Sequence, residues 1–364
     1  MPHDGNPASG SQRLAVLQVY RAIAAISVLL LHVNGKFTAP HYYGAQAWNT
    51  FLWGRMGVDF FFVLSGFIVT EVVARRPTPA NFFYNRFVRI YPPFWLAFGV
   101  TLVVATFMAS ELHSPVRQGP KELILAALLL PQDFEQPPVL TVAWTLWHEI
   151  LFYGIMGLSL VRPRIALAVA TLLLAGALRA PREFPASFFF SPLHWEFLMG
   201  FAVSRWGSAC ISQRWARPLL AAAGVALVVA CVAYDHGVLQ SMLARVGIFG
   251  VLFAVVIATS VVAERQRPLF GSRFRRVMAA LGDSSYVLYL WHIPLAVVVA
   301  KAAHHLFPAA QGWQIVVLSF AIAAVVALEA HLIHLLAERP LIVACRRVAG
   351  ELSRLWQGVR IQPR

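Results

Sequence analysis

Two residues of the first long apolar segment, Arg21 and His32, have side chains that bind anions and transfer protons. Eleven residues of α-helix turn through about 1100° and rise about 16 Å, so both side chains share one helix face at different depths. An arginine inside a membrane helix costs on the order of 3 kcal/mol, so it needs a partner or a wet cavity. A guanidinium that snorkels to the interface, or pairs with a neighbouring helix, would also meet this need. His32 on the same face favours the wet cavity.

The other polar residues of the apolar segments lie at different predicted depths in the membrane. Acid–base groups lie near the outer face: His32, Asp59, His148, Glu149, His194 and Glu196. His292 lies near the middle, on one helix face with Ser285 and Tyr289. Fixed positive charge lies toward the inner side: Arg21, Arg86 and Arg89. This pattern predicts a polar passage with acid–base groups outside and guanidinium groups inside.

Each of these residues also has a purely structural interpretation. Asp59 follows Gly57 at the start of a predicted helix and could be its N-terminal cap. The histidines and the carboxylate at 148, 194 and 196 could be interfacial residues. Arg86 and Arg89 could be anchors on the cytoplasmic side, and the polar face of Ser285, Tyr289 and His292 could join two helices. Glu149 is deeper, where an unpaired carboxylate is costly, and this favours a functional role or a pairing with arginine.

The elements that must position these residues are membrane helices. The chain has 364 residues, of which 59% are hydrophobic and 13% charged, and its mean hydropathy is +0.66. This composition indicates an all-α polytopic membrane protein, because the hydrocarbon core requires internally satisfied backbone groups. About ten spans are predicted, at 14–34, 56–74, 92–110, 144–161, 165–179, 188–205, 218–234, 245–263, 284–302 and 313–336. A short apolar segment near 121–131 is predicted to be re-entrant or interfacial, with an eleventh span as the alternative.

The basic residues favour ten spans with both termini cytoplasmic. In that topology the inner segments carry more than twice as many Lys and Arg residues as the outer ones, which is the positive-inside pattern. The formal charge of +14 is then explained by topology and by anionic lipid, and nucleic acid is not an expected partner. Residues 1–12 are predicted to be a disordered cytoplasmic N-terminus, and 341–364 a basic cytoplasmic tail that could form an interfacial helix. The three cysteines have no disulfide or metal-ligand spacing, so no metal is expected.

Taken together, six motifs along the chain resemble those of the acyltransferase 3 family of integral-membrane carbohydrate O-acyltransferases. They are similar to its R-x10-H signature, its GVDxFF segment, its RxxRIxP turn, its tryptophan-containing helix with Glu and Tyr, its SYxxYLxH helix and its closing ExP. The corresponding residues stand in family order: Arg21 with His32, 57–67, 86–92, 144–153, 285–292 and 338–340.

The resemblance implies an enzyme that transfers an acyl group, by family default acetyl, from cytoplasmic acyl-CoA to a hydroxyl of an envelope or exported glycan. Acceptors in this family include lipopolysaccharide, exopolysaccharide, Nod factor and peptidoglycan. The implied membrane domain is 13–340, in a bacterial inner membrane. Some members carry a periplasmic SGNH domain, and we expect none here, so any such activity would come from another polypeptide. The expected partners are the bilayer, acyl-CoA and a free or lipid-linked glycan, with a homodimer left open.

Within that implied reaction, each candidate residue has an expected role. His32 is the expected general base or acyl carrier, with Asp59 or Glu149 fixing its tautomer. Arg21, Ser285 and Tyr289 are candidate donors to the oxyanion. The expected donor-binding residues are Arg86, Arg89, Ser285, Tyr289 and His292, with guanidinium groups on the CoA phosphates. The alternative function is a polytopic transporter or exporter of a glycan or acyl metabolite, which would also need a charged lumen.

Overall fold

The computed structural model describes residues 7–48, 50–107, 119–133 and 138–359, and these residues form helices and connecting turns without a strand. The helices are α1 (Pro7–Phe37), α2 (Met56–Ala74), α3 (Pro79–Phe107), α5 (Pro120–Ala127), α6 (Trp144–Ser159), α7 (Pro163–Ala177), α8 (Ala186–Phe189), α9 (His194–Ala202), α10 (Ser208–Cys210), α11 (Gln213–Asp235), α12 (Met242–Glu264), α13 (Ser272–Asp283), α14 (Ser285–Leu306), α15 (Trp313–Ile333) and α16 (Arg339–Val359). The all-α prediction is therefore confirmed.

Within these described residues, seven helical segments are long and apolar enough to cross a membrane. They contain α1, α2, α3, α11, α12, α14 and α15. The other three predicted spans correspond to shorter helices: α6 has 16 residues, α7 has 15 and α9 has 9. The chain is thus a multi-pass membrane protein, but the count of ten is not confirmed. A single apolar run in the sequence can contain more than one structural element. The predicted span 188–205, for example, contains the end of α8, all of α9 and the start of a π-helical turn.

Helix α3 begins well before the predicted span at 92. Pro92 and Pro93 lie inside this helix, which starts at Pro79 and therefore includes Arg86 and Arg89. The sequence prediction ended the preceding amphipathic stretch at Pro92 because proline removes a helix hydrogen bond. Inside a helix bundle, neighbouring helices can satisfy the carbonyl groups that are freed. Consequently both arginines are held by a continuous helix rather than by a turn.

The segment near 121–131 contains α5, whose eight residues are too few to cross a bilayer. Two α3 side chains hold its C-terminal end. Trp95 Nε1 donates to the Ala127 carbonyl (2.8 Å) and the Tyr91 hydroxyl donates to the Leu128 carbonyl (3.2 Å). This argues against an eleventh span.

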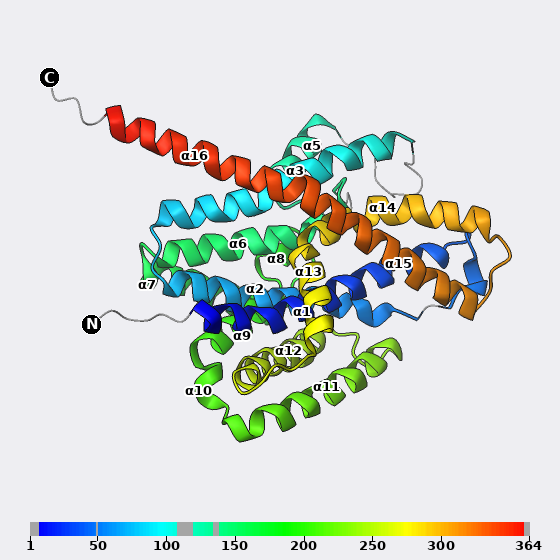
Figure 1. Cartoon of the computed structure of the whole chain (residues 1–364), viewed down its shortest axis with the longest axis horizontal. Coiled ribbons are helices and arrows are strands. Elements are labelled where there is room, and N and C mark those ends of the chain that lie inside the picture. Colours follow the sequence, from blue (N-terminus) through cyan, green and yellow to red (C-terminus); the bar gives the residue numbers. More distant parts are fainter. Residues whose placement is uncertain (1–6, 49, 108–118, 134–137, 360–364) are drawn as a thin grey trace.

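Both ends of the described chain are helical, at the predicted N-terminal arm and at the basic tail for which an interfacial helix was an option. Helix α1 begins at Pro7, so the part of 1–12 that the structure describes is helical, and residues 1–6 lie outside the described part. The basic tail forms α16, which continues from α15 through a π-helical turn, His334–Glu338. The Tyr84 hydroxyl of α3 donates to the Cys345 carbonyl of α16 (2.9 Å), so the tail helix packs against α3. Figure 1 shows the start of α1 and the end of α16 at the same end of the molecule.

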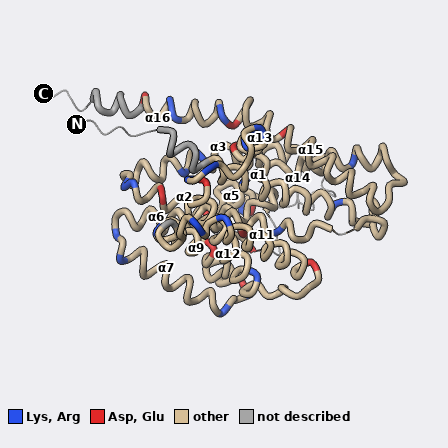
Figure 2. The backbone as a smooth tube through the Cα atoms, turned by 60° about the horizontal axis from the view of Figure 1, so that its bottom comes forward, with Lys and Arg blue, Asp and Glu red and all other residues tan. Residues whose placement is uncertain are grey.

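Charge is unevenly distributed over the bundle. Figure 2 shows Lys and Arg along α16 and near the start of α7, with fewer at the opposite end of the molecule. Blue and red segments also lie among the packed helices. An arrangement with basic residues gathered at one end suits a membrane protein whose inner face is the basic one.

Close helix packing at glycines brings the central helices together. A Cβ atom on Gly66 of α2 would overlap the Phe197 carbonyl of α9, and one on Gly200 of α9 would overlap the Val63 carbonyl of α2. A Cβ on Gly57 would lie 2.5 Å from the Ala24 carbonyl oxygen of α1. Small residues at such crossings let backbones approach closely. Helix α2 is thereby fixed between α1 and α9.

Candidate active site

A small cavity next to α1 contains most of the predicted positively charged residues. It has a volume of about 90 Å³, and we call it the arginine cavity because Arg21, Arg86 and Arg89 line it. Glu149, Ser285 and Tyr289 also line it. The structure therefore brings together six predicted site residues from α1, α3, α6 and α14.

Glu149 lines this arginine cavity, and His32 does not. The sequence prediction placed it with the acid–base groups near the outer face, and this is wrong. Ser65 Oγ donates to Glu149 Oε1 (3.2 Å), and the Tyr153 hydroxyl donates to the same oxygen. The prediction went wrong because His148 and Glu149 are adjacent, and adjacent residues on a helix point to different faces.

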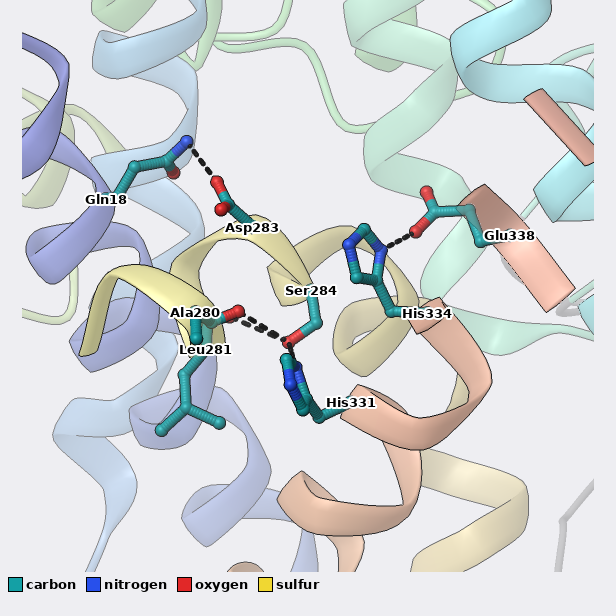
Figure 3. A network of polar contacts seen from close by, with 8 residues as sticks. All are labelled: Gln18, Ala280, Leu281, Asp283, Ser284, His331, His334 and Glu338. Carbon is teal, nitrogen blue, oxygen red and sulfur yellow. Dashed lines mark hydrogen bonds and ion pairs between the residues drawn. The ribbon is translucent and has the colours of Figure 1, made fainter. Parts of the chain in front are cut away.

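Two hydrogen bonds orient the guanidinium of Arg21. Its Nη1 donates to Gln18 Oε1 (3.1 Å), and Gln18 Nε2 donates to Asp283 Oδ1 (2.7 Å). Figure 3 shows Gln18 facing Asp283 at the junction of α13 and α14. Because Asp283 fixes which end of the Gln18 amide faces Arg21, the carboxylate positions the arginine without contacting it.

The closing ExP motif begins at Glu338, the last residue of the π-helical turn between α15 and α16, and continues into α16. His334 Nδ1 lies 2.5 Å from Glu338 Oε2, and His331 Nδ1 lies 3.4 Å from Ser284 Oγ. Figure 3 shows these side chains next to the Gln18–Asp283 pair. Glu338 is thus paired within its own turn, His331 links α15 to the start of α14, and none of the three motif residues lines the arginine cavity.

A second, larger cavity contains His32. Its volume is about 550 Å³, and we call it the histidine cavity. Arg55, Arg182 and Arg245 line it together with Asp133 and His148. It also has aromatic walls, formed by Trp144, Trp147, Phe184 and Phe188. Arg21 and His32 thus line different cavities, whereas the sequence predicted one polar passage that contains both.

The tautomer of His32 follows from its neighbours. His32 Nδ1 lies 2.8 Å from the Val28 carbonyl oxygen, and His292 Nδ1 lies 2.8 Å from the Tyr289 carbonyl oxygen. Carbonyl oxygens only accept, so both Nδ1 atoms carry hydrogen. His292 Nε2 is then bare and lies 3.2 Å from His32 Nδ1, where it shares that hydrogen. The assignment leaves His32 Nε2 unprotonated, as a general base requires.

This geometry corrects three expectations. Neither Asp59 nor Glu149 bonds to His32, because a backbone carbonyl and His292 occupy its Nδ1 side. His292 is 1% exposed and lines neither cavity, so it supports His32 and is not placed for binding a donor. Of the three residues on the polar face of α14, Ser285 and Tyr289 line the arginine cavity, whereas His292 contacts His32 in the protein interior.

Asp59 forms an ion pair that the sequence prediction missed. Arg245 Nε and Nη2 donate to its two carboxylate oxygens, at 3.0 and 2.5 Å. Asp59 is fully buried and makes no N-terminal cap for α2. Its partner comes from α12, far along the chain, and only the unusual position of an arginine on the outer side could have suggested it.

The other predicted interfacial residues are buried. His148 Nδ1 lies 3.1 Å from His194 Nε2, and these side chains are 5% and 9% exposed. Glu196 is fully buried. These three side chains are therefore packed inside the helix bundle.

Among the residues that the structure describes, Val58 and Tyr289 are the two that line both cavities. The Tyr289 hydroxyl is held by Thr145 Oγ1 (2.8 Å) and the Val142 carbonyl (3.0 Å). Val58 and Tyr289 therefore form the partition between the arginine cavity and the histidine cavity.

Two buried polar atoms of arginine-cavity residues have no hydrogen-bond partner: Ser285 Oγ and Arg86 Nε. Buried donors and acceptors are costly when unpaired, so these atoms are suited to a polar ligand. No group of metal-ligating side chains occurs among the residues that the structure describes.

Comparison with known proteins shows which family the chain belongs to. A family model described as an acyltransferase domain, Acyl_transf_3, matches residues 15–328. The chain belongs to the acyltransferase 3 family. It is therefore an acyltransferase.

Three curated relatives match different shares of the chain. The exopolysaccharide production protein ExoZ of Rhizobium meliloti is 33% identical over 269 residues, covering 68% of this chain and 78% of ExoZ. YrhL of Bacillus subtilis, a candidate peptidoglycan O-acetyltransferase, is 26% identical over 317 residues, covering 76% of this chain and 48% of YrhL. The acyltransferase MdmB of Streptomyces mycarofaciens is 28% identical over 149 residues, covering 39% of this chain and 38% of MdmB. The chain thus spans about half the length of YrhL and less of MdmB. No solved structure matches the chain.

In this acyltransferase the family motifs surround the partition. The GVDxFF segment supplies Val58, the SYxxYLxH helix supplies Tyr289, and the R-x10-H pair supplies one residue to each cavity. The motifs that are far apart in the sequence are therefore joined at one place in the fold.

Proposed function

We propose that this acyltransferase takes an acyl group from cytoplasmic acyl-CoA through the arginine cavity and transfers it to a glycan hydroxyl in the histidine cavity. One observation carries the proposal: a cavity lined by three arginines and a cavity lined by His32 have Val58 and Tyr289 as shared lining residues. The names of ExoZ and YrhL support a glycan acceptor, and that of YrhL supports acetyl as the acyl group. The basic end of the molecule supports a cytoplasmic location for both termini, in a bacterial cytoplasmic membrane.

The size of the arginine cavity limits what it holds. Sites that enclose a drug-sized ligand measure about 300–1,000 Å³, whereas this cavity measures about 90 Å³. An acyl thioester fits that space and a nucleotide does not. We therefore assign Arg86 and Arg89 to the CoA diphosphate at the cavity entrance, and Arg21, Ser285 and Tyr289 to the thioester carbonyl.

The reaction needs a base, an oxyanion site and an aligned thioester. His32 Nε2 removes the hydroxyl proton as the sugar oxygen attacks the thioester carbon. Collapse of the tetrahedral intermediate breaks the carbon–sulfur bond, and the CoA thiolate leaves and receives the proton from His32. An acyl-histidine route would use the same nitrogen as the nucleophile. Both routes require the Nδ1–H tautomer described above.

A single experiment tests donor and base together. Purified protein in detergent is incubated with acetyl-CoA labelled on the acetyl group and a glycan extract, and the label lost from CoA is measured. We expect loss with wild type and none with His32→Ala. His305→Ala, an exposed histidine on α14 outside both cavities, is the control and should behave as wild type.

Other outcomes would contradict the proposal. Normal turnover by His32→Ala would remove this residue from the chemistry. An absence of turnover by wild type would reject acetyl-CoA as donor and would favour the transporter alternative, which needs a gradient and no thioester.

A further inference from the structure

The histidine cavity has the size and the walls of a saccharide site. Its volume of about 550 Å³ lies within the range of about 300–1,000 Å³ that is typical of small-ligand sites. Trp144, Trp147, Phe184 and Phe188 supply apolar ring faces. Such faces pack against the C–H face of a sugar ring, while polar groups fix the orientation of its hydroxyls.

The charged residues of this cavity are mostly arginines. Arg55, Arg182 and Arg245 line it, against one lining carboxylate, Asp133. Arg55 and Arg182 are exposed, so they stand where a ligand enters. Arg55 Nη1 donates to the Tyr234 hydroxyl (3.1 Å), which holds the side chain against α11.

Arg245 is a buried residue of the cavity wall that is held in place by an ion pair. It is 8% exposed, and its Nε and Nη2 groups bind the fully buried Asp59. A guanidinium has five N–H donors, and this pairing uses two of them. Asp59 thereby fixes the side chain in place, and the remaining donors can meet a ligand that enters the cavity.

Topology makes these arginines unusual. Outward segments are poor in Lys and Arg under the positive-inside rule, and the predicted topology places all three arginines in outward segments. Membrane insertion therefore does not explain why three of them line one cavity. Asp59 accounts for the position of Arg245, and a ligand with negative charge would account for Arg55 and Arg182 and would use the remaining donors of Arg245.

We propose that the histidine cavity selects an acceptor glycan that carries an anionic group, a carboxylate or a phosphate, with Arg245 as the specificity-determining residue. The inference rests on the proposed function, because it defines the acceptor of that same transfer. Arg55 and Arg182 attract the anion at the entrance, and Arg245 binds it beside His32. A carboxylate would belong to an acidic sugar, and a phosphate to a lipid-linked or phosphorylated saccharide.

The test is a binding measurement with matched saccharides. The first probe is a tetrasaccharide of alternating glucuronate and N-acetylglucosamine. The second is the same tetrasaccharide with its carboxylates reduced to hydroxymethyl groups, and the third is the reduced form with an anomeric phosphate. Calorimetry with the purified protein at low salt gives each Kd. We expect at least one anionic probe to bind about tenfold more tightly than the neutral one, as charge-assisted bonds to arginine predict. The tighter anionic probe identifies the source of the charge.

Variants of the cavity arginines then show which residues cause the preference for anionic saccharides. Arg182→Gln should reduce the anionic preference without changing the Kd of the neutral probe. Arg245→Gln alone would leave Asp59 as an unpaired buried charge and could unfold the protein, so Asp59→Asn/Arg245→Gln removes both charges together. This double variant should abolish the preference. Arg179→Gln, an exposed arginine outside the described cavities, is the control and should retain it.

The inference and the proposed function fail in distinguishable ways. Equal binding of all three probes, binding of none at millimolar concentration, or an unchanged preference in the double variant would overturn the inference. Acetyl-CoA turnover is measured on the same preparation, and it would still establish the acyltransferase reaction in each of those cases. Anion-selective binding without any turnover would instead contradict the choice of donor.

Discussion

At the scale of single residues, the contact between His32 and His292 decides which nitrogen can act. Both rings use Nδ1–H toward backbone carbonyls, and His292 Nε2 shares the hydrogen of His32 Nδ1. Two neutral imidazoles are compatible with this geometry, whereas two imidazolium rings would repel each other. In the proposed reaction His292 is therefore a positioning residue, which would act on the substrate only through His32.

Replacing His292 tests this positioning role. In His292→Leu, His32 keeps its stronger contact to the Val28 carbonyl and so keeps its tautomer, but it loses the second acceptor. One neutral hydrogen bond is worth about 1 kcal/mol, so we expect the transfer rate to fall about fivefold. Steady-state transfer from acetyl-CoA measures the change. A loss as complete as that of His32→Ala would show that His292 itself reacts, and an unchanged rate would show that the contact is incidental.

Residue types and spacing predicted part of the grouping of the candidate residues and did not predict their bonding partners. Arg21, Arg86, Arg89, Ser285 and Tyr289 do line one cavity. The partners of Asp59 and His32 could not be predicted, because Arg245 and His292 come from helices hundreds of residues away. Helix periodicity gives the face of a residue on its own helix, and it gives no information about the neighbouring helix.

At the scale of elements, the apolar runs located the helices well and their ends less well. Helix α2 begins and ends where predicted, at Met56 and Ala74. Helix α3 extends beyond its two prolines, and 188–205 divides into α8, α9 and a π-helical turn. Helix α13 was not predicted, because its polar face hides it from a search for apolar runs.

The crossing of α2 and α9 depends on glycines in a way that can be measured. In Gly66→Ala, the new methyl group would overlap the Phe197 carbonyl, so the helices must separate. Overpacking of this kind costs about 1–3 kcal/mol, and we expect a lower melting temperature in detergent. Gly154→Ala is the control, because nothing lies within 4 Å of a Cβ at that position of α6. Equal melting temperatures for the two variants would mean that α2 and α9 are not in close contact.

At the scale of the whole molecule, the bundle contains two polar cavities of different size that share lining residues. Among the described residues, Val58 and Tyr289 line both the arginine cavity and the histidine cavity. An acyl group that starts beside Arg21 must pass this partition to reach a hydroxyl beside His32. The rate of transfer should therefore depend on the size of the side chain at 58.

Val58→Phe narrows the partition and Val58→Ala widens it, without changing any charged residue. Because small misplacements of reacting groups cost about 100-fold in rate, we expect Val58→Phe to lose most acyl transfer while its Kd for CoA stays that of wild type. Val58→Ala is the matched control and should transfer normally, and melting temperatures in detergent show that both variants fold. Labelled acetyl-CoA measures transfer, and calorimetry measures CoA binding. Wild-type transfer by Val58→Phe would mean that the acyl group reaches His32 by another path, and a parallel loss of CoA binding would place Val58 in the donor site alone.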